Sequence, residues 1–389
     1  MRVAYVCADP GIPVFGYKGA SIHIQGMLRE MLNAGMDVTL FTCRGFSPVP
    51  EEFRAVRVVP LFDLSGTDSD EEKASQALRG NQELKSRLVS AGPFDVVYER
   101  YSLWSFAGME YARNAGIPGI LEVNAPLPLE QKRWRKMVME HEAYQVLELV
   151  LEHASTVIAV SPGIRRWLET LPATEGKVHV VRNGVNPASF YKKNMARGSV
   201  FTVVFSGTLK PWHGMDTLAE AFILLRRQRT DISLSIIGDG PERPALENAF
   251  RSAGVDNAVV FHGGVAHCDV PALLACADAG VAPYPHFDDF YFSPLKIYEY
   301  MAAELPVITS RTGDLDSIVK HEKTGLLIPP ESPSALSDAI ITLADSPSLC
   351  RKMGEAGGLY VKQNSWENVL RKIWLYADIT LLTGGLDEV

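Results

Sequence analysis

Residues 290–310 read FYFSPLKIYEYMAAELPVITS, which indicates a loop, a short helix and a short buried strand in that order. Ser293 is a residue type favoured at helix N-caps and Pro294 suits the first helical position, so the pattern predicts that the helix begins here. Lys296 and Glu299 lie one turn apart on this helix, whose other positions are apolar. The stretch therefore sets two opposite charges on an otherwise apolar element.

The N-terminus of a helix carries free N–H groups and the positive end of the dipole, and both favour an anion. A cation in the first turn, such as Lys296, is unfavourable there by roughly a few tenths of a kcal/mol unless an anion binds beside it. A phosphate at Lys296, with Glu299 accepting hydrogen bonds from sugar hydroxyls, explains both charges. The alternative is a solvated ion pair on the helix surface.

Length and composition describe an ordinary globular protein of two domains. The chain has 389 residues, which is more than one hydrophobic core usually holds. Apolar residues make up 47% and charged residues 22% of the chain. The formal charge of −8 argues against general binding to DNA or RNA.

The cysteines and the apolar runs bear on the cellular compartment. The five cysteines are odd in number and contain no CxxC pair, so we expect neither a disulfide framework nor a zinc site. The opening MRVAYVCADP is too short and too soon broken for a signal peptide, and no uncharged apolar run reaches the ~18 residues of a membrane span. These features predict a cytoplasmic protein.

Short apolar segments alternate with helical patterns along the whole chain, which predicts parallel βαβ units with helices on both faces of each sheet. The strands predicted for the N-terminal half are residues 2–8, 37–43, 95–100, 119–125 and 156–161. The pattern then starts again after a polar, turn-rich stretch, and the strands predicted for the second half are 200–207, 232–238, 258–263, 279–284 and 306–310.

The fold class predicted from this pattern is α/β, with two Rossmann-like doubly wound domains facing across a cleft. We assign residues 1–184 to the first domain and 185–365 to the second. A last helical pattern, 366–389, is expected to pack back on the first domain. Because ligands of open α/β sheets bind at the carboxyl ends of the strands, the interdomain cleft is the expected site.

Glycine-rich turns follow two strands of the second domain. Gly207 ends the strand in FSGTLKPWHGMD, and Lys210 and His213 follow in the turn before a helix. Glycine permits close approach of a ligand to the backbone, and a lysine or a protonated histidine faces a phosphate favourably. Gly238 and Gly240 form a similar but less specific turn in IIGDGPERPAL. The alternative is a set of ordinary surface loops.

The first domain contributes candidates for the other wall of the cleft. Gly19 precedes a helix in FGYKGASIH, without the GxGxxG spacing of a dinucleotide fold, and we expect the helix amides after it to face the cleft. Arg100, Glu122 and Asn124 follow successive predicted strands, where polar residues are candidates for binding an acceptor.

Two charged segments are further candidate sites. QKRWRK, residues 131–136, concentrates four cations around a tryptophan and is a candidate for contact with an anionic lipid or a charged acceptor, against a plain solvated helix face. The adjacent carboxylates of Asp288 and Asp289 are too few for a metal site, so no metal ligands are predicted.

Several segments, taken in order, resemble glycosyltransferase family 4 over nearly the whole chain. Those in the second half resemble its donor domain, and those in the first half resemble its acceptor domain. The segments are GYKGASIHIQGMLREM, YERYS, LEVNAPL, ASTVIAVSPG, GTLKPWHGMDTLAEA, IIGDGPERPAL, VVFHGGV, ADAGVAPY and SPLKIYEYMAAELPVITS.

The resemblance implies the GT-B fold and transfer of a hexose-type sugar from a UDP- or GDP-sugar to a hydroxyl acceptor. It also implies retention of the anomeric configuration, with no metal and no cofactor, and a role in polysaccharide, glycolipid or glycoconjugate synthesis. Lys296, Lys210 and His213 then stabilise the diphosphate, while Glu299 holds the ribose. The other donor-side residues implied are Gly19, Gly207, Gly238, Gly240, Gly264, Val265, Tyr291, Ser293, Pro294 and Leu295.

This chain departs from the family pattern at two places. Tyr291 stands where many members carry the first glutamate of a Glu-x7-Glu motif, which bears on recognition of the donor sugar. Thr208 and His213 stand where members often carry an arginine and a lysine, and Lys210 and Lys296 resemble substitutes for those cations. Two other functions are considered, namely a nucleotide-sugar epimerase of similar bilobal fold and a non-catalytic binding homologue.

Overall fold

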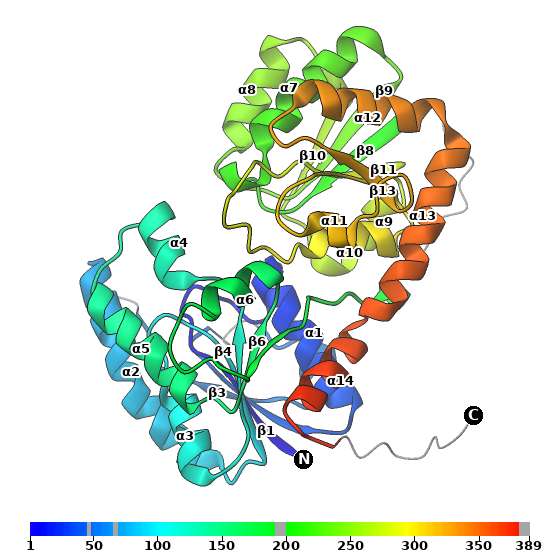
Figure 1. Ribbon diagram of the computed structural model, residues 1–389. Coiled ribbons are helices and arrows are strands. Elements are labelled where there is room, and N and C mark those ends of the chain that lie inside the picture. The colour runs from blue at the N-terminus through cyan, green and yellow to red at the C-terminus, as the bar shows by residue number, and fades with distance from the viewer. Residues whose placement is uncertain (45–47, 65–68, 191–199, 381–389) are drawn as a thin grey trace, which may run out of the picture.

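The computed structural model describes residues 1–44, 48–64, 69–190 and 200–380, and these form two α/β domains (Figure 1). The first sheet has the order β3-β2-β1-β4-β5-β6-β7 and the second β10-β9-β8-β11-β12-β13, and neighbouring strands in both are parallel. Both orders reverse direction next to the first strand of the sheet, as in doubly wound folds. The predicted fold class is confirmed.

The strands and helices of the first domain are β1 Arg2–Cys7, α1 Gly19–Asn33, β2 Asp37–Thr42, β3 Arg57–Pro60, α2 Asp70–Ala91, β4 Val96–Arg100, α3 Ala107–Ala115, β5 Gly119–Val123, α4 Leu127–Trp134, α5 Glu140–His153, β6 Thr156–Ala159, α6 Pro162–Leu168 and β7 Val178–Val180. Those that follow are β8 Phe201–Ser206, α7 Met215–Gln228, β9 Ile232–Ile237, α8 Arg243–Ser252, β10 Val259–Gly263, α9 Val270–Leu274, β11 Ala279–Ala282, α10 Leu295–Ala302, β12 Val307–Ser310, α11 Leu315–Ile318, β13 Gly325–Ile328, α12 Pro333–Asp345, α13 Pro347–Val361 and α14 Trp366–Tyr376.

Each sheet is buried on both faces because its strands alternate between two cores. In β1, Val3 and Tyr5 lie in the core on one face, and Ala4 and Val6 lie in the core on the other. The central strand β8 of the second domain divides its side chains between two cores in the same way. This double burial explains why the central strands are nearly continuous apolar runs.

All ten strands predicted from the sequence are present, and three strands were missed. These are β3, β7 and β13, and each lies at an edge of its sheet. β3 and β7 are only partly buried. β3 and β7 therefore lack the apolar run by which the central strands were recognised, whereas β13 is a buried run that the sequence reasoning overlooked.

The predicted start of the SPLK helix needs correction. Helix α10 begins at Leu295 with Pro294 as its N-cap, and no side chain caps it. The hydroxyl of Ser293 accepts a hydrogen bond from the backbone N–H of Asn183 instead, at 3.1 Å. Ser293 thus contacts the segment that joins the domains, and the free amides of α10 remain uncapped.

The chain passes between the two domains twice, and the two passages are hydrogen-bonded to each other. The N–H of Val185 donates to the carbonyl of Asn364 at 3.0 Å, and the N–H of Trp366 donates to the carbonyl of Val185 at 3.2 Å. Gly184 is needed here, since a Cβ on it would lie 2.9 Å from the backbone nitrogen of Trp366. A short parallel bridge therefore links the two crossings.

After the second crossing, α14 packs beside α1 of the first domain (Figure 1). Trp366 and Trp374 are buried there in the core that contains the first strand. Gly26 of α1 makes room for the indole of Trp366, because a Cβ at this position would lie 2.5 Å from it. The helix predicted for 366–389 ends at Tyr376, and residues 381–389 lie outside the described residues.

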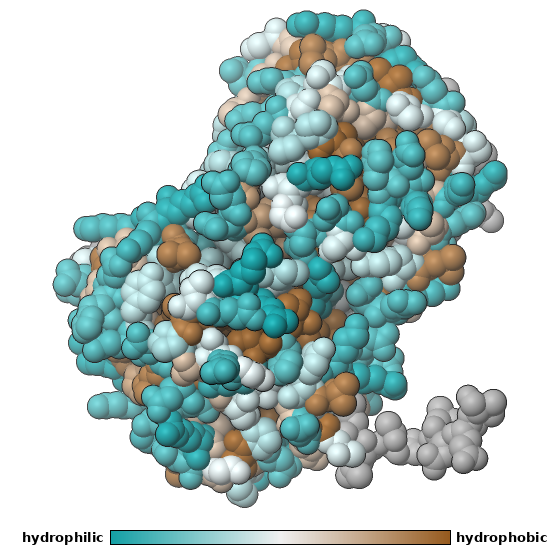
Figure 2. All heavy atoms as spheres, viewed as in Figure 1, coloured by the Kyte–Doolittle hydropathy of each residue, from teal (hydrophilic) through white to brown (hydrophobic). Residues whose placement is uncertain are grey.

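In the space-filling view the two domains appear as separate lobes joined at a waist, with apolar atoms exposed near the place where the lobes meet (Figure 2).

Within the described ranges, none of the helices combines the length and apolar character needed to cross a membrane.

Replacing Trp374 by alanine should lower the free energy of unfolding by about 3–5 kcal/mol, because its indole is fully buried and leaves a large cavity. Urea denaturation followed by circular dichroism measures the change. Leu375→Ala is the control, since Leu375 is 72% exposed and should change stability by no more than about 0.5 kcal/mol. Equal effects of the two substitutions would contradict the docking of α14.

Candidate active site

A cavity of about 370 Å³ lies between the domains, at the carboxyl ends of the central strands. Most of the residues predicted as site residues line it, and they come from both domains. These are Gly19, Arg100, Asn124, Gly207, His213, Gly238, Gly264, Val265, Ser293, Pro294, Leu295, Lys296 and Glu299. Four predicted residues are not among the lining residues, namely Lys210, Gly240, Glu122 and Tyr291.

Lys296 is the most unusual charged group in the cavity wall. Its side chain is buried, and its ammonium has no hydrogen-bond partner within the part of the chain that is described. The Nζ atom lies 4.1 Å from the centre of the Phe205 ring, and the aromatic face is its nearest favourable contact. Burial lowers the pKa of Lys296 from 10.5 to about 7, and Glu299 offsets only part of that effect. An anion bound in this cavity would therefore have a favourable partner in Lys296.

Glu299 lies near the same cavity wall and has a partner that the sequence did not reveal. The Nε2 atom of His267 lies 2.8 Å from one carboxylate oxygen of Glu299. His267 also lines the cavity. This contact orients the carboxylate of Glu299, and within the described residues its second oxygen is left to accept a hydrogen bond from a ligand hydroxyl.

Two glycines let the backbone approach Lys296 closely. Gly207 has φ = 137°, and a Cβ on it would lie 2.9 Å from the Nζ atom of Lys296. Gly238 has φ = 138°, and a Cβ there would lie 2.0 Å from the carbonyl oxygen of Gly207. Gly240 serves packing instead, since its Cβ would meet the carbonyl of Leu209 at 2.3 Å. Gly207 and Gly238 therefore let neighbouring strand ends lie close together at the cavity, whereas Gly240 is not part of its wall.

His213 lines the cavity, but in a form other than the predicted one. Burial, and then the charge of Lys296, lower the pKa of His213 to about 3, so the ring is neutral. Its Nδ1 atom lies 2.6 Å from the carbonyl oxygen of Thr208, so Nδ1 carries the ring hydrogen and donates a hydrogen bond to that oxygen. The expectation of a protonated His213 facing a phosphate is wrong for the free protein, because burial disfavours the charged ring and Lys296 adds to that effect.

Lys210 and Tyr291 point elsewhere. The ammonium of Lys210 lies 5.3 Å from the centre of the Trp212 ring. The hydroxyl of Tyr291 donates to the carboxylate of Glu130 in α4, and its carbonyl accepts from the hydroxyl of Ser161 at 2.6 Å. Tyr291 thus joins the second domain to the first. An aromatic ring at this position is stabilised by interdomain contacts that a shorter glutamate would not make.

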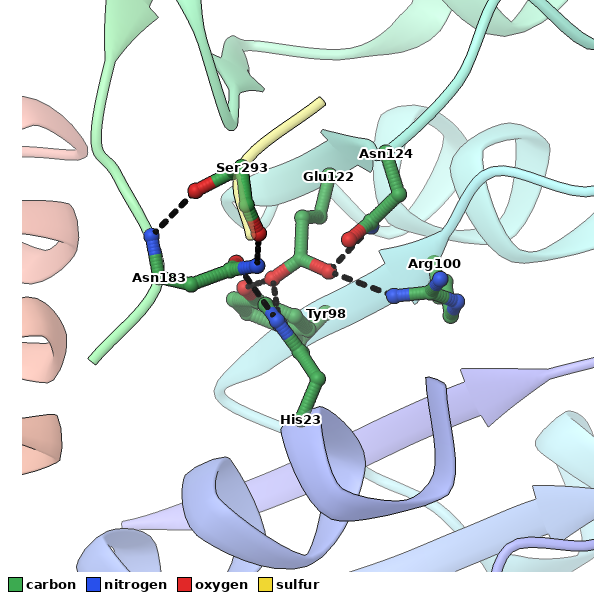
Figure 3. A network of polar contacts seen from close by, with 7 residues as sticks. All are labelled: His23, Tyr98, Arg100, Glu122, Asn124, Asn183 and Ser293. Atoms are coloured by element: carbon green, nitrogen blue, oxygen red, sulfur yellow. Dashed lines mark hydrogen bonds and ion pairs between the residues drawn. The ribbon is translucent and has the colours of Figure 1, made fainter. Parts of the chain in front are cut away.

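Glu122 is buried at the carboxyl end of β5 and is the centre of a polar network (Figure 3). It accepts hydrogen bonds from four groups: Tyr98, Arg100 at 3.2 Å, Asn124 at 2.5 Å and His23 at 2.8 Å. Burial alone would raise the pKa of this carboxyl, but His23, Arg100 and Tyr98 lower it to about 2. Glu122 therefore does not line the cavity, but it orients His23, Arg100 and Asn124, which do.

His23 extends this network to the second domain. Its Nδ1 atom lies 2.9 Å from the side-chain oxygen of Asn183, whose amide nitrogen donates to the carbonyl of Ser293 at 2.7 Å (Figure 3). Both ring nitrogens of His23 thus lie within hydrogen-bonding distance of side-chain oxygens. Sequence reasoning missed His23 and Asn183. The available signal was a histidine within the helical pattern that begins at residue 23.

The comparisons with known proteins agree with this arrangement. The model described as "Glycosyltransferase Family 4" matches residues 17–189, and that described as "Glycosyl transferases group 1" matches residues 200–346. The chain belongs to glycosyltransferase family 4. A D-inositol 3-phosphate glycosyltransferase of Jonesia denitrificans is 25% identical, over 94% of this chain and 93% of its own length.

A second relative of this family 4 member is a GDP-mannose-dependent alpha-(1-6)-phosphatidylinositol monomannoside mannosyltransferase of Mycobacterium tuberculosis. It is 32% identical over 47% of this chain and 48% of its own length.

Solved structures show the same fold. Sucrose-phosphate synthase of Thermosynechococcus elongatus has a TM-score of 0.78 at 22% identity and covers 97% of this chain and 98% of its own. Anabaena HepE in complex with UDP-glucose has a TM-score of 0.72 at 17% identity and covers 97% of this chain and 99% of its own. The GT-B fold expected from the sequence is confirmed.

The low pKa of Glu122 predicts how Glu122→Gln changes the response to acid. A carboxyl whose pKa is lowered by folding stabilises the protein above its ordinary value of 4.5, and this stabilisation is lost as pH falls towards about 2. The wild type should therefore be more stable than Glu122→Gln at pH 6, by on the order of 1–3 kcal/mol, and the difference should shrink at pH 3. Urea denaturation at both pH values measures it. A constant difference would contradict the assignment.

Proposed function

We propose that this family 4 glycosyltransferase transfers a hexose-type sugar, with retention of configuration, from a nucleoside-diphosphate sugar to a hydroxyl acceptor. The observation that carries the proposal is the buried, unpartnered ammonium of Lys296 in the interdomain cavity. A buried charge is costly unless it is paired, so the site is built to receive an anion. A diphosphate supplies that charge, and its leaving group gains negative charge in the transition state.

Two helix N-termini support a diphosphate at this position. Gly19 and Ala20, at the start of α1, line the cavity, and α1 has neither a side-chain cap nor an acidic residue in its first turn. The start of α10, at Leu295, is uncapped as well. Free N–H groups and two positive dipole ends therefore favour the diphosphate.

The nucleoside fits beyond the diphosphate in the same cavity. Glu299, oriented by His267, is placed to accept hydrogen bonds from ribose hydroxyls. Gly238, Gly264 and Val265 line the neighbouring part of the wall, where a base has room. The similar proteins include a GDP-mannose-dependent enzyme and a structure in complex with UDP-glucose, so UDP- and GDP-sugars are both candidate donors.

The acceptor enters on the side of the first domain, beside Arg100 and Asn124. Glu122 behind them is an unsuitable general base, because it already accepts four hydrogen bonds and its pKa is about 2. This supports a mechanism in which the departing phosphate takes the proton of the acceptor hydroxyl, as expected for a retaining enzyme of this fold. Metal independence is part of the same proposal. The described residues contain no group of three or more histidine, cysteine or carboxylate side chains arranged for a metal ion.

The direct test is a panel of UDP- and GDP-sugars, each incubated with and without a cell extract that supplies acceptors. Release of nucleoside diphosphate only with extract supports transfer. Conversion of the donor to another sugar without extract would instead support the epimerase, and binding without turnover the non-catalytic homologue. The comparisons with glycosyltransferases do not favour either alternative.

Replacing Lys296 by methionine should lower turnover and raise stability. Turnover should fall about 100-fold or more, which is the loss of ~2.7 kcal/mol expected for one donor to the leaving group. Stability should rise by about 1 kcal/mol, because a buried unpaired ammonium is replaced by an apolar chain of similar size. Donor turnover and urea denaturation measure the two effects.

Lys210→Met is the matched control for Lys296→Met. Its ammonium lies over Trp212, outside the cavity wall, so we expect a much smaller loss of turnover and no gain in stability. Near-normal turnover of Lys296→Met with the correct donor would refute the phosphate role of Lys296.

Diphosphate binding should take up a proton above pH 7. Lys296 has a pKa of about 7 in the free protein, so it is largely neutral at pH 8, and a bound diphosphate raises that pKa by its charge. Titration calorimetry of UDP and GDP, in two buffers with different heats of ionisation, should show uptake approaching one proton at pH 8 and little at pH 5.5. Uptake that persists in Lys296→Met would assign the proton to another group.

A further inference from the structure

A group of aromatic rings, one exposed and two half-buried, connects the two domains where α4 approaches the second domain (Figure 1). Trp134, the last residue of α4, is 39% exposed, and its ring lies 5.3 Å from that of Trp212 and 6.4 Å from that of Phe287. We call these three residues the aromatic bridge. Trp212 and Phe287 belong to two different loops of the second domain, so the bridge exists only when the domains face each other.

The aromatic bridge is continuous with the wall of the cavity. The ring of Trp212 lies 6.3 Å from that of His213, and the ring of Phe287 lies 6.0 Å from that of Phe292. His213 and Phe292 both line the cavity. Contacts between rings therefore connect the bridge to the cavity wall.

Cations without carboxylate partners surround this surface. The guanidinium of Arg133 lies 4.9 Å from the centre of the Trp134 ring and 5.0 Å from that of Phe287. Among the described residues, Arg133, Arg135 and Lys136 have no ion-pair partner. All three are exposed.

Most nearby carboxylates are already engaged. Glu140 pairs with Lys132, and Glu130 accepts from Tyr291. Asp288 pairs with His286, which leaves Asp289 as an exposed carboxylate on the same loop. The hydrogen bond from the neutral Tyr291 hydroxyl leaves the charge of Glu130 in place, so the case for an anion rests on Arg133, whose guanidinium lies over the rings without an ion-pair partner among the described residues.

We propose that the aromatic bridge and Arg133 form an acceptor subsite for a carbohydrate that carries a phosphate or a carboxylate. Sugar rings present C–H groups that pack on exposed indole faces. The planar guanidinium of Arg133, already stacked on two rings, keeps its N–H edge for a bidentate contact with the anion. This inference rests on the proposed function, because it assigns the acceptor class for the same cavity.

The inference is tested by titration calorimetry with three trisaccharides that end in glucuronic acid, glucose 6-phosphate or glucose. UDP or GDP, whichever raises the melting temperature, is present to fill the donor site. The wild type should bind an acidic trisaccharide at least about tenfold more tightly than the neutral one. Arg133→Ala should abolish this preference, and Trp134→Ala should weaken binding of all three by about tenfold.

Two controls match these variants. Tyr376 is an exposed aromatic (41%) on α14, and Arg251 is an exposed cation on α8, so Tyr376→Ala and Arg251→Ala should bind like the wild type. Equal binding of acidic and neutral trisaccharides, binding of neither, or an unchanged preference in Arg133→Ala would overturn the proposal. So would loss of sedimentation with phosphatidylglycerol vesicles in Trp134→Ala while trisaccharide binding is kept, since that result assigns the bridge to a membrane. A protein with no response to either nucleotide would refute the proposed function instead.

Discussion

The ammonium of Lys296 is held out of water with the rings of Phe205 and Tyr284 beside it, and this constraint organises the site. The glycine at position 207 leaves room for it, and its charge adds to the burial that keeps His213 neutral. Such a charge is tolerated in a folded protein because it is neutralised in part by loss of its proton and, in the working state, by a ligand. The buried ammonium thus lowers the stability of the free protein, and the same unpaired charge favours binding of an anion.

A chain of buried polar contacts links the first domain to the segment that precedes Lys296. His23 joins Glu122 to Asn183, and Asn183 holds Ser293, three residues before Lys296. The acceptor wall and the start of the lysine-bearing helix therefore share one hydrogen-bonded network (Figure 3). Such networks are sensitive to geometry, because each buried donor or acceptor that loses its partner carries the full cost of desolvation.

Sequence reasoning recovered the fold because the central strands are buried on both faces and read as apolar runs, whereas β3 and β7 at the sheet edges are only partly buried. It found Lys296 and Glu299 because a charge is conspicuous on an apolar helix. It did not find His267, His23 or Asn183, whose partners lie 32, 99 and 110 residues away along the chain. Tyr291 and Lys210 were placed by their position in a motif, but Tyr291 bonds to Glu130 of the other domain and Lys210 lies over Trp212 of its own loop.

The paired crossings near Val185 and Ser365 have a mechanical consequence. Two strands of backbone, hydrogen-bonded side by side, bend together much more easily than they twist past one another. They therefore define a hinge axis, and the domains are expected to open and close about that axis while their lateral register is kept. Lys296 and the N-terminus of α1 would then separate and return along one reproducible path, so that each closure rebuilds the same cavity.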